Sequence, residues 1–208
     1  MNQAAWQARV DDVTGRFGLE SPARFLFSPW ARIGDAEVVF ASRNPGFSGP
    51  DAPDAGGLAT DRSVYAEPDE AATTPMTGQV QALSAFLGVP LTRILAGTIT
   101  PFRVARFGDL ARDARDTAFE LGRAFWSEVL ARPRRLVIAS GVEAAEMFRE
   151  ILGLPETLNI ASGWGNTRLV RCGAPGRALV LLPNLSQYRL FARPACRAPL
   201  ARVFEGLV

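Results

Sequence analysis

The chain has 208 residues, of which 48% are hydrophobic, and a formal net charge of +2. It contains neither His nor Lys, so all 23 basic residues are Arg. The absence of His excludes a Ser-His-Asp triad and the commonest zinc ligand, which leaves carboxylates, amides, hydroxyls and backbone groups to carry any catalysis. Two cysteines, Cys172 and Cys196, supply neither a disulfide framework nor a metal cluster. We therefore expect no metal and no cofactor.

The same composition predicts one globular domain spanning residues 1–208. The N-terminal residues lack the basic and apolar regions of a signal peptide, and no apolar run reaches the roughly 18 residues of a membrane span. We expect a cytoplasmic, monomeric protein with no membrane partner.

The charges are unevenly distributed along the chain. Residues 1–100 contain 7 Arg and 11 acidic residues, whereas residues 101–208 contain 16 Arg and 10 acidic residues. From residue 165 onward, Glu205 is the only acidic residue. A basic C-terminal part fits a polyanionic partner such as DNA, and it also fits a solvated basic face.

In chain order, the apolar patterns predict a helix over 4–17, a short helix over 24–28, a strand over 37–42, a loop over 47–76, a helix over 78–87, a strand over 93–98, a helix over about 109–131, a strand over 134–139, a helix over 142–152, two strands over 167–171 and 177–182, and a helix over about 194–207. This alternation predicts an α/β fold of the three-layer α/β/α type, with a mostly parallel, roughly four-stranded central sheet. The carboxyl ends of the strands then share one edge, where ligands bind in such sheets.

The first strand ends abruptly at Asn44-Pro45-Gly46. Pro45 keeps Asn44 out of the helical region, and a glycine allows a sharp corner, so a short polar side chain is left at the sheet edge. An ordinary turn has the same pattern. The long loop that follows favours a site, because loops of this length in compact domains are functional or disordered.

A second polar corner follows the apolar strand 177–182, where the sequence is Pro183-Asn184-Leu185-Ser186. Arg-Asn-Pro-Gly in the first corner and Leu-Pro-Asn-Leu-Ser in the second together resemble the uracil-DNA glycosylase superfamily, and most of all its mismatch-specific branch. The resemblance covers about residues 36–192. It implies a uracil-DNA glycosylase-like fold and a monofunctional DNA glycosylase, which removes uracil or a related deaminated or mismatched base by hydrolysing the N-glycosidic bond.

The resemblance also implies a role for each matching residue. Asn44 would position the hydrolytic water, and Asn184 would stabilise the departing base. The residues implied to bind the base are Pro45, Gly46, Phe47, Thr98 and Ser186. The residues implied to contact DNA are Leu185, Gln187, Tyr188 and Arg189. The implied partner is DNA that contains uracil or a mispaired base.

Three places depart from the family pattern: Ser42 replaces a glycine, Gly56-Gly57 stands where a base-stacking aromatic is usual, and Thr98-Ile99-Thr100 stands where an Asn that reads the base edge is common. Phe47 and Tyr65 are the candidate replacements, and Trp164 is either an exposed stacking residue or a buried anchor. Two other functions stay open: a nucleic-acid-binding module that does not cleave, and an enzyme that acts on free nucleobases or nucleosides.

Overall fold

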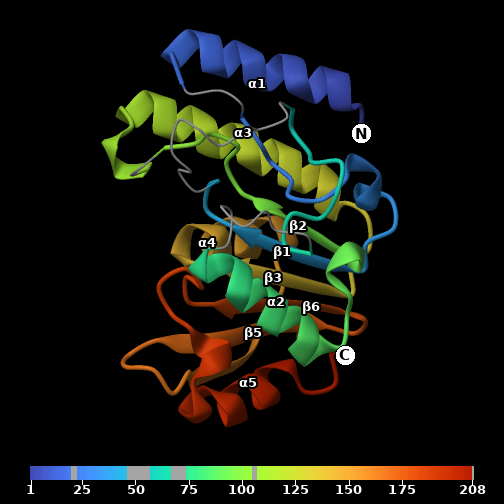
Figure 1. Ribbon diagram of the computed structural model, residues 1–208, viewed down its shortest axis with the longest axis vertical. Coiled ribbons are helices and arrows are strands. Elements are labelled where there is room, and N and C mark those ends of the chain that lie inside the picture. The colour runs from blue at the N-terminus through green and yellow to red at the C-terminus, as the bar shows by residue number, and fades with distance from the viewer. Residues whose placement is uncertain (20–22, 46–56, 67–73, 105–106, 208) are drawn as a thin grey trace.

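The computed structural model describes residues 1–19, 23–45, 57–66, 74–104 and 107–207 (Figure 1). Its α-helices are α1 (Gln3–Phe17), α2 (Pro75–Leu87), α3 (Arg112–Leu130), α4 (Val142–Leu152) and α5 (Arg197–Phe204). Its strands are β1 (Val38–Ser42), β2 (Ile94–Thr98), β3 (Leu136–Ser140), β4 (Glu156–Ala161), β5 (Arg168–Ala174) and β6 (Arg177–Leu182). Within these segments, no helix combines the length and the apolar character that a membrane crossing requires.

The strands form one six-stranded sheet in the order β2-β1-β3-β6-β5-β4. The pairs β1–β2, β1–β3 and β3–β6 are parallel, whereas β5 runs antiparallel to both β4 and β6. The fold is therefore mixed α/β with a mostly parallel sheet, and the strands predicted over 167–171 and 177–182 are confirmed as β5 and β6. The predicted count of roughly four strands is too low, because β4 was not predicted and β5 adds an antiparallel extension.

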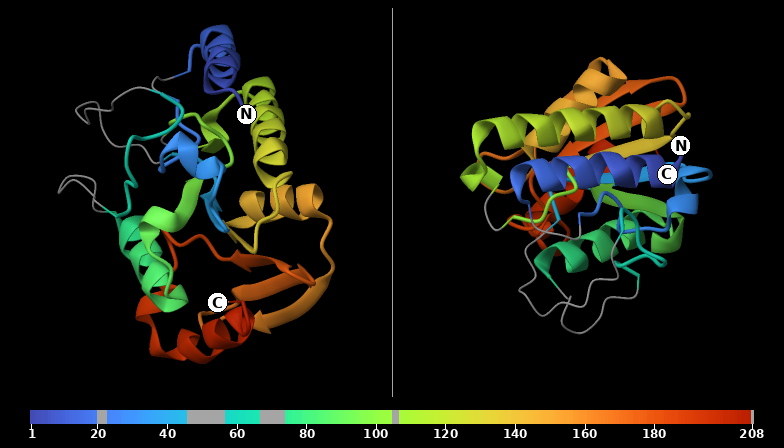
Figure 2. Two further views of the ribbon diagram at one scale, coloured as in Figure 1. Left: turned by 90° about the vertical axis from the view of Figure 1, so that its right-hand side faces the viewer. Right: turned by 90° about the horizontal axis from the view of Figure 1, so that it is seen from above.

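Alternate residues of the central strands enter two separate hydrophobic clusters. Val39, Ala41 and Val137 belong to the first cluster, to which α1, α3 and α4 contribute their buried side chains. Val38, Phe40 and Ile138 belong to the second cluster, which contains buried residues of α2 and α5. In the left view of Figure 2, α1, α3 and α4 lie to one side of the sheet and α2 and α5 to the other. The five residues of β1 are all buried, as strands covered on both faces are.

The short helix predicted over 24–28 is wrong. This segment is extended along the outer edge of β2, where Leu26 forms an antiparallel bridge with Gly97. The Phe27 N–H donates to the Ala96 carbonyl at 2.9 Å, and the Thr98 N–H donates to the Phe25 carbonyl at 2.8 Å. The unpaired backbone groups of an edge strand outweigh a weak local helix preference here, and the segment covers that edge.

Helix α3 touches the chain that leaves β2 by direct backbone contact. A Cβ atom at Gly122 would overlap the carbonyl oxygen of Ile99, so only glycine lets the helix come this close. This close contact lets the residues after β2 lie next to the end of β1. There the Ile99 N–H donates to the Ser42 carbonyl at 2.8 Å, and the Thr100 N–H donates to the Arg43 carbonyl at 3.0 Å.

The strand order also fixes where a ligand is expected. Strand β1 has β2 as one neighbour and β3 as the other. The chain passes from β1 to β2, and then from β2 past β1 to β3. The direction of winding thus reverses between β1 and β3. In open α/β sheets, ligands bind in the crevice outside the carboxyl ends of the strands at such a reversal.

Candidate functional site

The corner after β1 holds Asn44 by both ends of its amide. Its Nδ2 donates to the Pro45 carbonyl at 2.8 Å and lies 3.5 Å from the Val104 carbonyl, and its Oδ1 accepts from Arg43 Nε at 3.2 Å. The structure places Asn44 at the carboxyl edge, as predicted. Its amide braces the corner, which leaves one acceptor position on Oδ1 for any further partner.

Arg43 connects this corner to the first turn of α4. Its guanidinium NH1 donates to Glu143 Oε1 at 2.8 Å, and its guanidinium carbon lies 5.7 Å from the centre of the Phe107 ring. The side chains of Arg43 and Glu143 are 37% and 36% exposed. Because water screens an ion pair exposed to this degree, it contributes about 1 kcal/mol or less and opens readily.

The corners after β3 and β6 are joined through Ser140. Its buried hydroxyl accepts from the Leu185 N–H at 3.0 Å, and the next residue, Gly141, donates its N–H to the Leu182 carbonyl at 3.0 Å. These bonds fix residues 183–185 against the start of α4, so that Asn184 stands beside Gly141.

Asn184 is oriented by Ser186. Both the N–H and the hydroxyl of Ser186 donate to Asn184 Oδ1, at 3.0 and 2.8 Å. Because the oxygen end of the amide is engaged in this way, its NH2 end is left to donate. The Asn184 carbonyl accepts from the Tyr188 N–H at 2.9 Å, which closes a turn over residues 184–188.

The two corners meet at the start of α4. A Cβ atom built on Gly141 would lie 3.8 Å from Asn184 Cβ and 3.9 Å from Glu143 Oε2. The Glu143 carboxylate thus pairs with Arg43 and lies near Gly141, and Asn184 lies beside the same glycine. Gly141 precedes α4 without a side-chain cap, so the helix presents unbonded N–H groups and its positive dipole end at the same place. We call Arg43, Asn44, Glu143 and Asn184 the edge site.

Three predicted or alternative site residues are core residues instead, which corrects their assignment. Thr98 is 0% exposed and its hydroxyl donates to the Arg24 carbonyl, so it is not available to a base. Leu185 is also 0% exposed, in the second cluster, and cannot insert into DNA without leaving the core. Tyr65 packs edge-on against Phe27 and Phe40, and burial raises the pKa of its phenol.

The other predicted residues fall into two groups. Pro45 is buried, while Ser186, Gln187 and Arg189 are exposed and Tyr188 is half-buried. Gly46 and Phe47 lie outside the described residues, so their predicted contact with a base stays a prediction.

Glu143 and Arg43 are the residues of the edge site that sequence reasoning missed. A glutamate in the first turn of a helix has an ordinary explanation in the helix dipole, and its partner Arg43 lies 100 positions away in the chain. The available signal was its place directly after the predicted strand exit Ser140-Gly141, at the same edge as Asn44 and Asn184.

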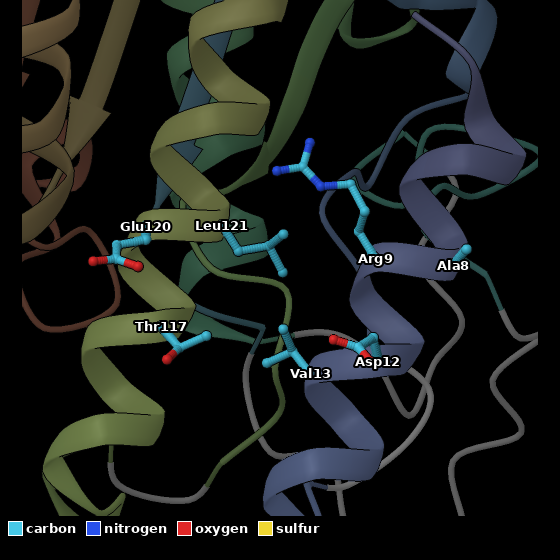
Figure 3. Close-up of a pocket in the computed structure, with 7 residues that line it drawn as sticks. All are labelled: Ala8, Arg9, Asp12, Val13, Thr117, Glu120 and Leu121. Atoms are coloured by element: carbon cyan, nitrogen blue, oxygen red, sulfur yellow. The ribbon is translucent and has the colours of Figure 1, made fainter.

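The two cavities described in the structure lie away from the edge site. A groove of about 480 Å³ between α1 and α3 is lined by Ala8, Arg9, Asp12, Val13, Thr117, Glu120 and Leu121 (Figure 3). A second cavity, of about 280 Å³, lies near the amino ends of β1 and β2 and contains the Arg32–Asp35 ion pair. Neither brings together the carboxylate and the amide donor that distinguish the edge site.

Comparison with known proteins does not assign a family. No family model and no curated protein matches the chain. Among matching solved structures is the crystal structure of the protein CinA with unknown function from Thermoplasma acidophilum, with 10% identity and a TM-score of 0.37, covering 84% of this chain and 99% of that chain. So distant a likeness carries no argument about function.

The resemblance to the uracil-DNA glycosylase superfamily is therefore wrong as a family assignment, since the comparisons give this distant likeness and no match to a family model. The physical reason lies in the motifs themselves. Asn-Pro-Gly and Pro-Asn-x-Ser are compact turn sequences, which suit the exit of any buried parallel strand. Any function must be argued from the edge site alone.

Proposed function

We propose that this chain hydrolyses the N-glycosidic bond of a deaminated or mispaired base in DNA, and that the reaction takes place at the edge site. The observation that supports the proposal is that the Glu143 carboxylate, which pairs with Arg43, and Asn184 both lie near Gly141, next to the reversal of strand order. We infer that the helices form a three-layer α/β/α arrangement around this sheet.

The charges of the edge site match those that develop in this reaction. As the bond to the base breaks, the sugar becomes positively charged and the base becomes negatively charged. The Glu143 carboxylate would stabilise the sugar cation and orient the attacking water. The water adds its hydroxyl group to the sugar carbon, and its proton is released to the departing base or to solvent.

The departing base requires hydrogen-bond donors. The NH2 group of Asn184 has its orientation set by Ser186, and the uncapped start of α4 adds backbone N–H groups close by. Donors fixed in advance stabilise a developing anion without a cost of reorganisation, so they lower the barrier. Asn44 serves this arrangement by bracing the β1 corner.

One observation favours a second candidate, a nucleic-acid-binding module that does not cleave. The amide of Asn44 is engaged at both ends, which weakens its predicted role in holding water. Under this alternative, the edge site binds an extrahelical base and Glu143 only pairs with Arg43.

The two candidates are separated by measuring release of a base. Labelled duplexes carrying G·U, A·U, G·T or hypoxanthine pairs are incubated with the protein, and abasic sites are then cleaved with alkali. We expect release from at least one substrate, and a loss of about 10²–10³-fold with Glu143→Gln or Asn184→Ala.

Glu146→Gln is the matched control, because it removes the same charge from an exposed position of the same helix. It should keep the wild-type rate. No release above background by wild type on any substrate would overturn the catalytic proposal and leave the binding module. Equal release by wild type and Glu143→Gln would overturn the role given to Glu143.

A further inference from the structure

A group of aromatic and Arg side chains adjoins the edge site. Because β5 is antiparallel to both β4 and β6, the latter two strands point the same way, and the loop after β4 opens at the same edge as Asn184. That loop carries Trp164, and the segment after β6 carries Tyr188, Arg189 and Arg193. We call these four residues the Trp164 patch. In Figure 1 the loop between β4 and β5 projects beside the segment that follows β6.

The loop that carries Trp164 is built to hold one conformation. The Trp164 N–H donates to Ser162 Oγ at 3.0 Å, and Thr167 Oγ1 donates to the Trp164 carbonyl at 2.7 Å. Gly163 has φ +85°, and a Cβ atom there would overlap the carbonyl oxygen of Ala195. The loop is thus closed on itself and pressed against the segment after β6, so little entropy is lost when a ligand binds to it.

Within the patch, the Arg193 guanidinium stacks on the aromatic ring of Trp164. The guanidinium carbon of Arg193 lies 4.5 Å from the centre of the Trp164 ring, and the Tyr188 ring lies edge-on to Trp164 with 6.0 Å between centres. Arg189 and Arg193 are exposed, and no carboxylate among the described residues forms an ion pair with either. A stacked guanidinium keeps its N–H edge available for a phosphate.

These features match a particular ligand chemistry. Aromatic rings that accept stacked bases, next to Arg side chains that pair with phosphates, are the elements with which proteins hold single-stranded nucleic acid. In a duplex the base faces are covered by their neighbours, so a ring at the protein surface has no base face to stack on. The turn over residues 184–188 connects the patch directly to Asn184.

We propose that the Trp164 patch binds a single-stranded stretch of DNA next to the nucleotide that occupies the edge site. One unstacked base lies against Trp164 and Tyr188, and the adjoining phosphates contact Arg189 and Arg193. The inference rests on the proposed function, because it names the strand form of that substrate. It adds that a deaminated base is bound in a single strand in preference to a duplex, whereas a mispaired base exists only in a duplex.

Binding is tested apart from cleavage, with fluorescence anisotropy of a labelled oligothymidylate about 12 nucleotides long, which contains no deaminated or mispaired base. The same strand annealed to its complement is the duplex comparison. We expect tighter binding of the single strand, and about 10-fold weaker single-strand binding with Trp164→Ala or Arg193→Ala, since stacking contributes about 1–3 kcal/mol per base. Trp164→Phe keeps an aromatic ring and should stay within about threefold of wild type.

Arg202→Ala is the control for charge alone, because Arg202 is exposed in the last turn of α5, outside the patch. It should change single-strand affinity by less than about threefold, and circular dichroism verifies that each variant is folded. For Arg193→Ala, the slope of log affinity against log salt should fall by about 0.7, the contribution of one phosphate contact on a single strand.

Tighter binding of the duplex, or equal single-strand affinity of wild type, Trp164→Ala and Arg193→Ala, would overturn the inference. Neither result bears on the proposed catalytic function, which the base-release assay with Glu143→Gln tests separately. Loss of binding in the patch variants together with no base release in any assay would support the patch and overturn catalysis.

Discussion

Arg134 shows how a single buried cation organises its surroundings. It is 2% exposed, and its guanidinium donates to the carbonyls of Ala36, Ile33 and Val129 at 2.5, 2.6 and 3.1 Å. Burial lowers the pKa of this guanidinium below its usual value. Its N–H groups hydrogen-bond carbonyl groups of the segment before β1 and of the end of α3. Without Arg134, these buried carbonyls would lose that donor.

Replacing this residue tests that role. Arg134→Met is expected to lower the free energy of unfolding by about 3 kcal/mol or more, because three carbonyl oxygens lose their donor in a buried place. Urea denaturation followed by circular dichroism measures the change. The neighbouring Arg135→Met removes an exposed Arg and should stay within about 0.5 kcal/mol of wild type. Equal effects of the two substitutions would contradict the prediction.

At the residue scale, the sequence was informative where a side chain follows a strand directly. Asn44 and Asn184 were predicted at the carboxyl edge from the corners that contain them, and the structure places both there. Thr98 and Leu185 were misjudged, because the residue that turns inward at a strand end depends on packing that local sequence does not determine. Glu143 required knowledge of the strand order, since its partner comes from a distant corner.

At the scale of elements, Gly141 determines how β3 passes into α4. Its backbone angles, φ 99° and ψ 163°, lie in a region that only glycine adopts readily. A Cβ atom there would make only ordinary van der Waals contacts, with the nearest atoms 3.8 and 3.9 Å away. Any penalty of substitution therefore comes from backbone strain and not from a clash.

A pair of glycine substitutions separates these effects. Gly141→Ala should destabilise the protein by about 1–3 kcal/mol because of the strained backbone angles. Gly78→Ala, inside α2 with nothing within 4 Å, should instead stabilise it by about 0.5–1 kcal/mol. Thermal denaturation of both variants gives opposite shifts if the reasoning holds. A Gly141→Ala protein as stable as wild type would show that the corner relaxes into another conformation.

Elements with strong periodicity were predicted well. The bounds of α4 agree with the prediction, because a strand exit precedes it and Gly153 follows it. Strand β4 was missed, because four of its six residues are exposed and its apolar residues are interrupted by a polar one. Segment 24–28 was misassigned, since its conformation is dictated by the edge of β2 and not by its own residues.

At the scale of the whole molecule, the two cysteines lie in the hydrophobic clusters on opposite faces of the sheet. Cys172 belongs to the first hydrophobic cluster and is 1% exposed, while Cys196 belongs to the second and is 0% exposed. Burial raises the pKa of both thiols, so each is poorer in reactive thiolate than a free cysteine. Both must be uncovered before they react.

Alkylation therefore tests whether residues 1–208 form one cooperative unit. At pH near 8 we expect both thiols to react with iodoacetamide at least about a thousandfold more slowly than in the denatured chain, and at similar rates to each other. Peptide mass spectrometry measures both sites in the same sample. A much faster reaction at one site would show that its side of the sheet opens independently, against the single domain predicted from the sequence.

The contact between Gly122 and Ile99 gives α3 influence over a site to which it contributes no side chain. Through Gly122 the helix contacts Ile99. In the same segment, the Thr100 N–H donates to the Arg43 carbonyl, and the Val104 carbonyl lies within reach of the Asn44 side-chain amide. A methyl group at position 122 would displace the helix outward, remove its contact with Ile99 and loosen the corner after β1. Attempts to re-engineer the substrate preference of this protein would therefore do well to treat position 122 as fixed, although it lies in the core.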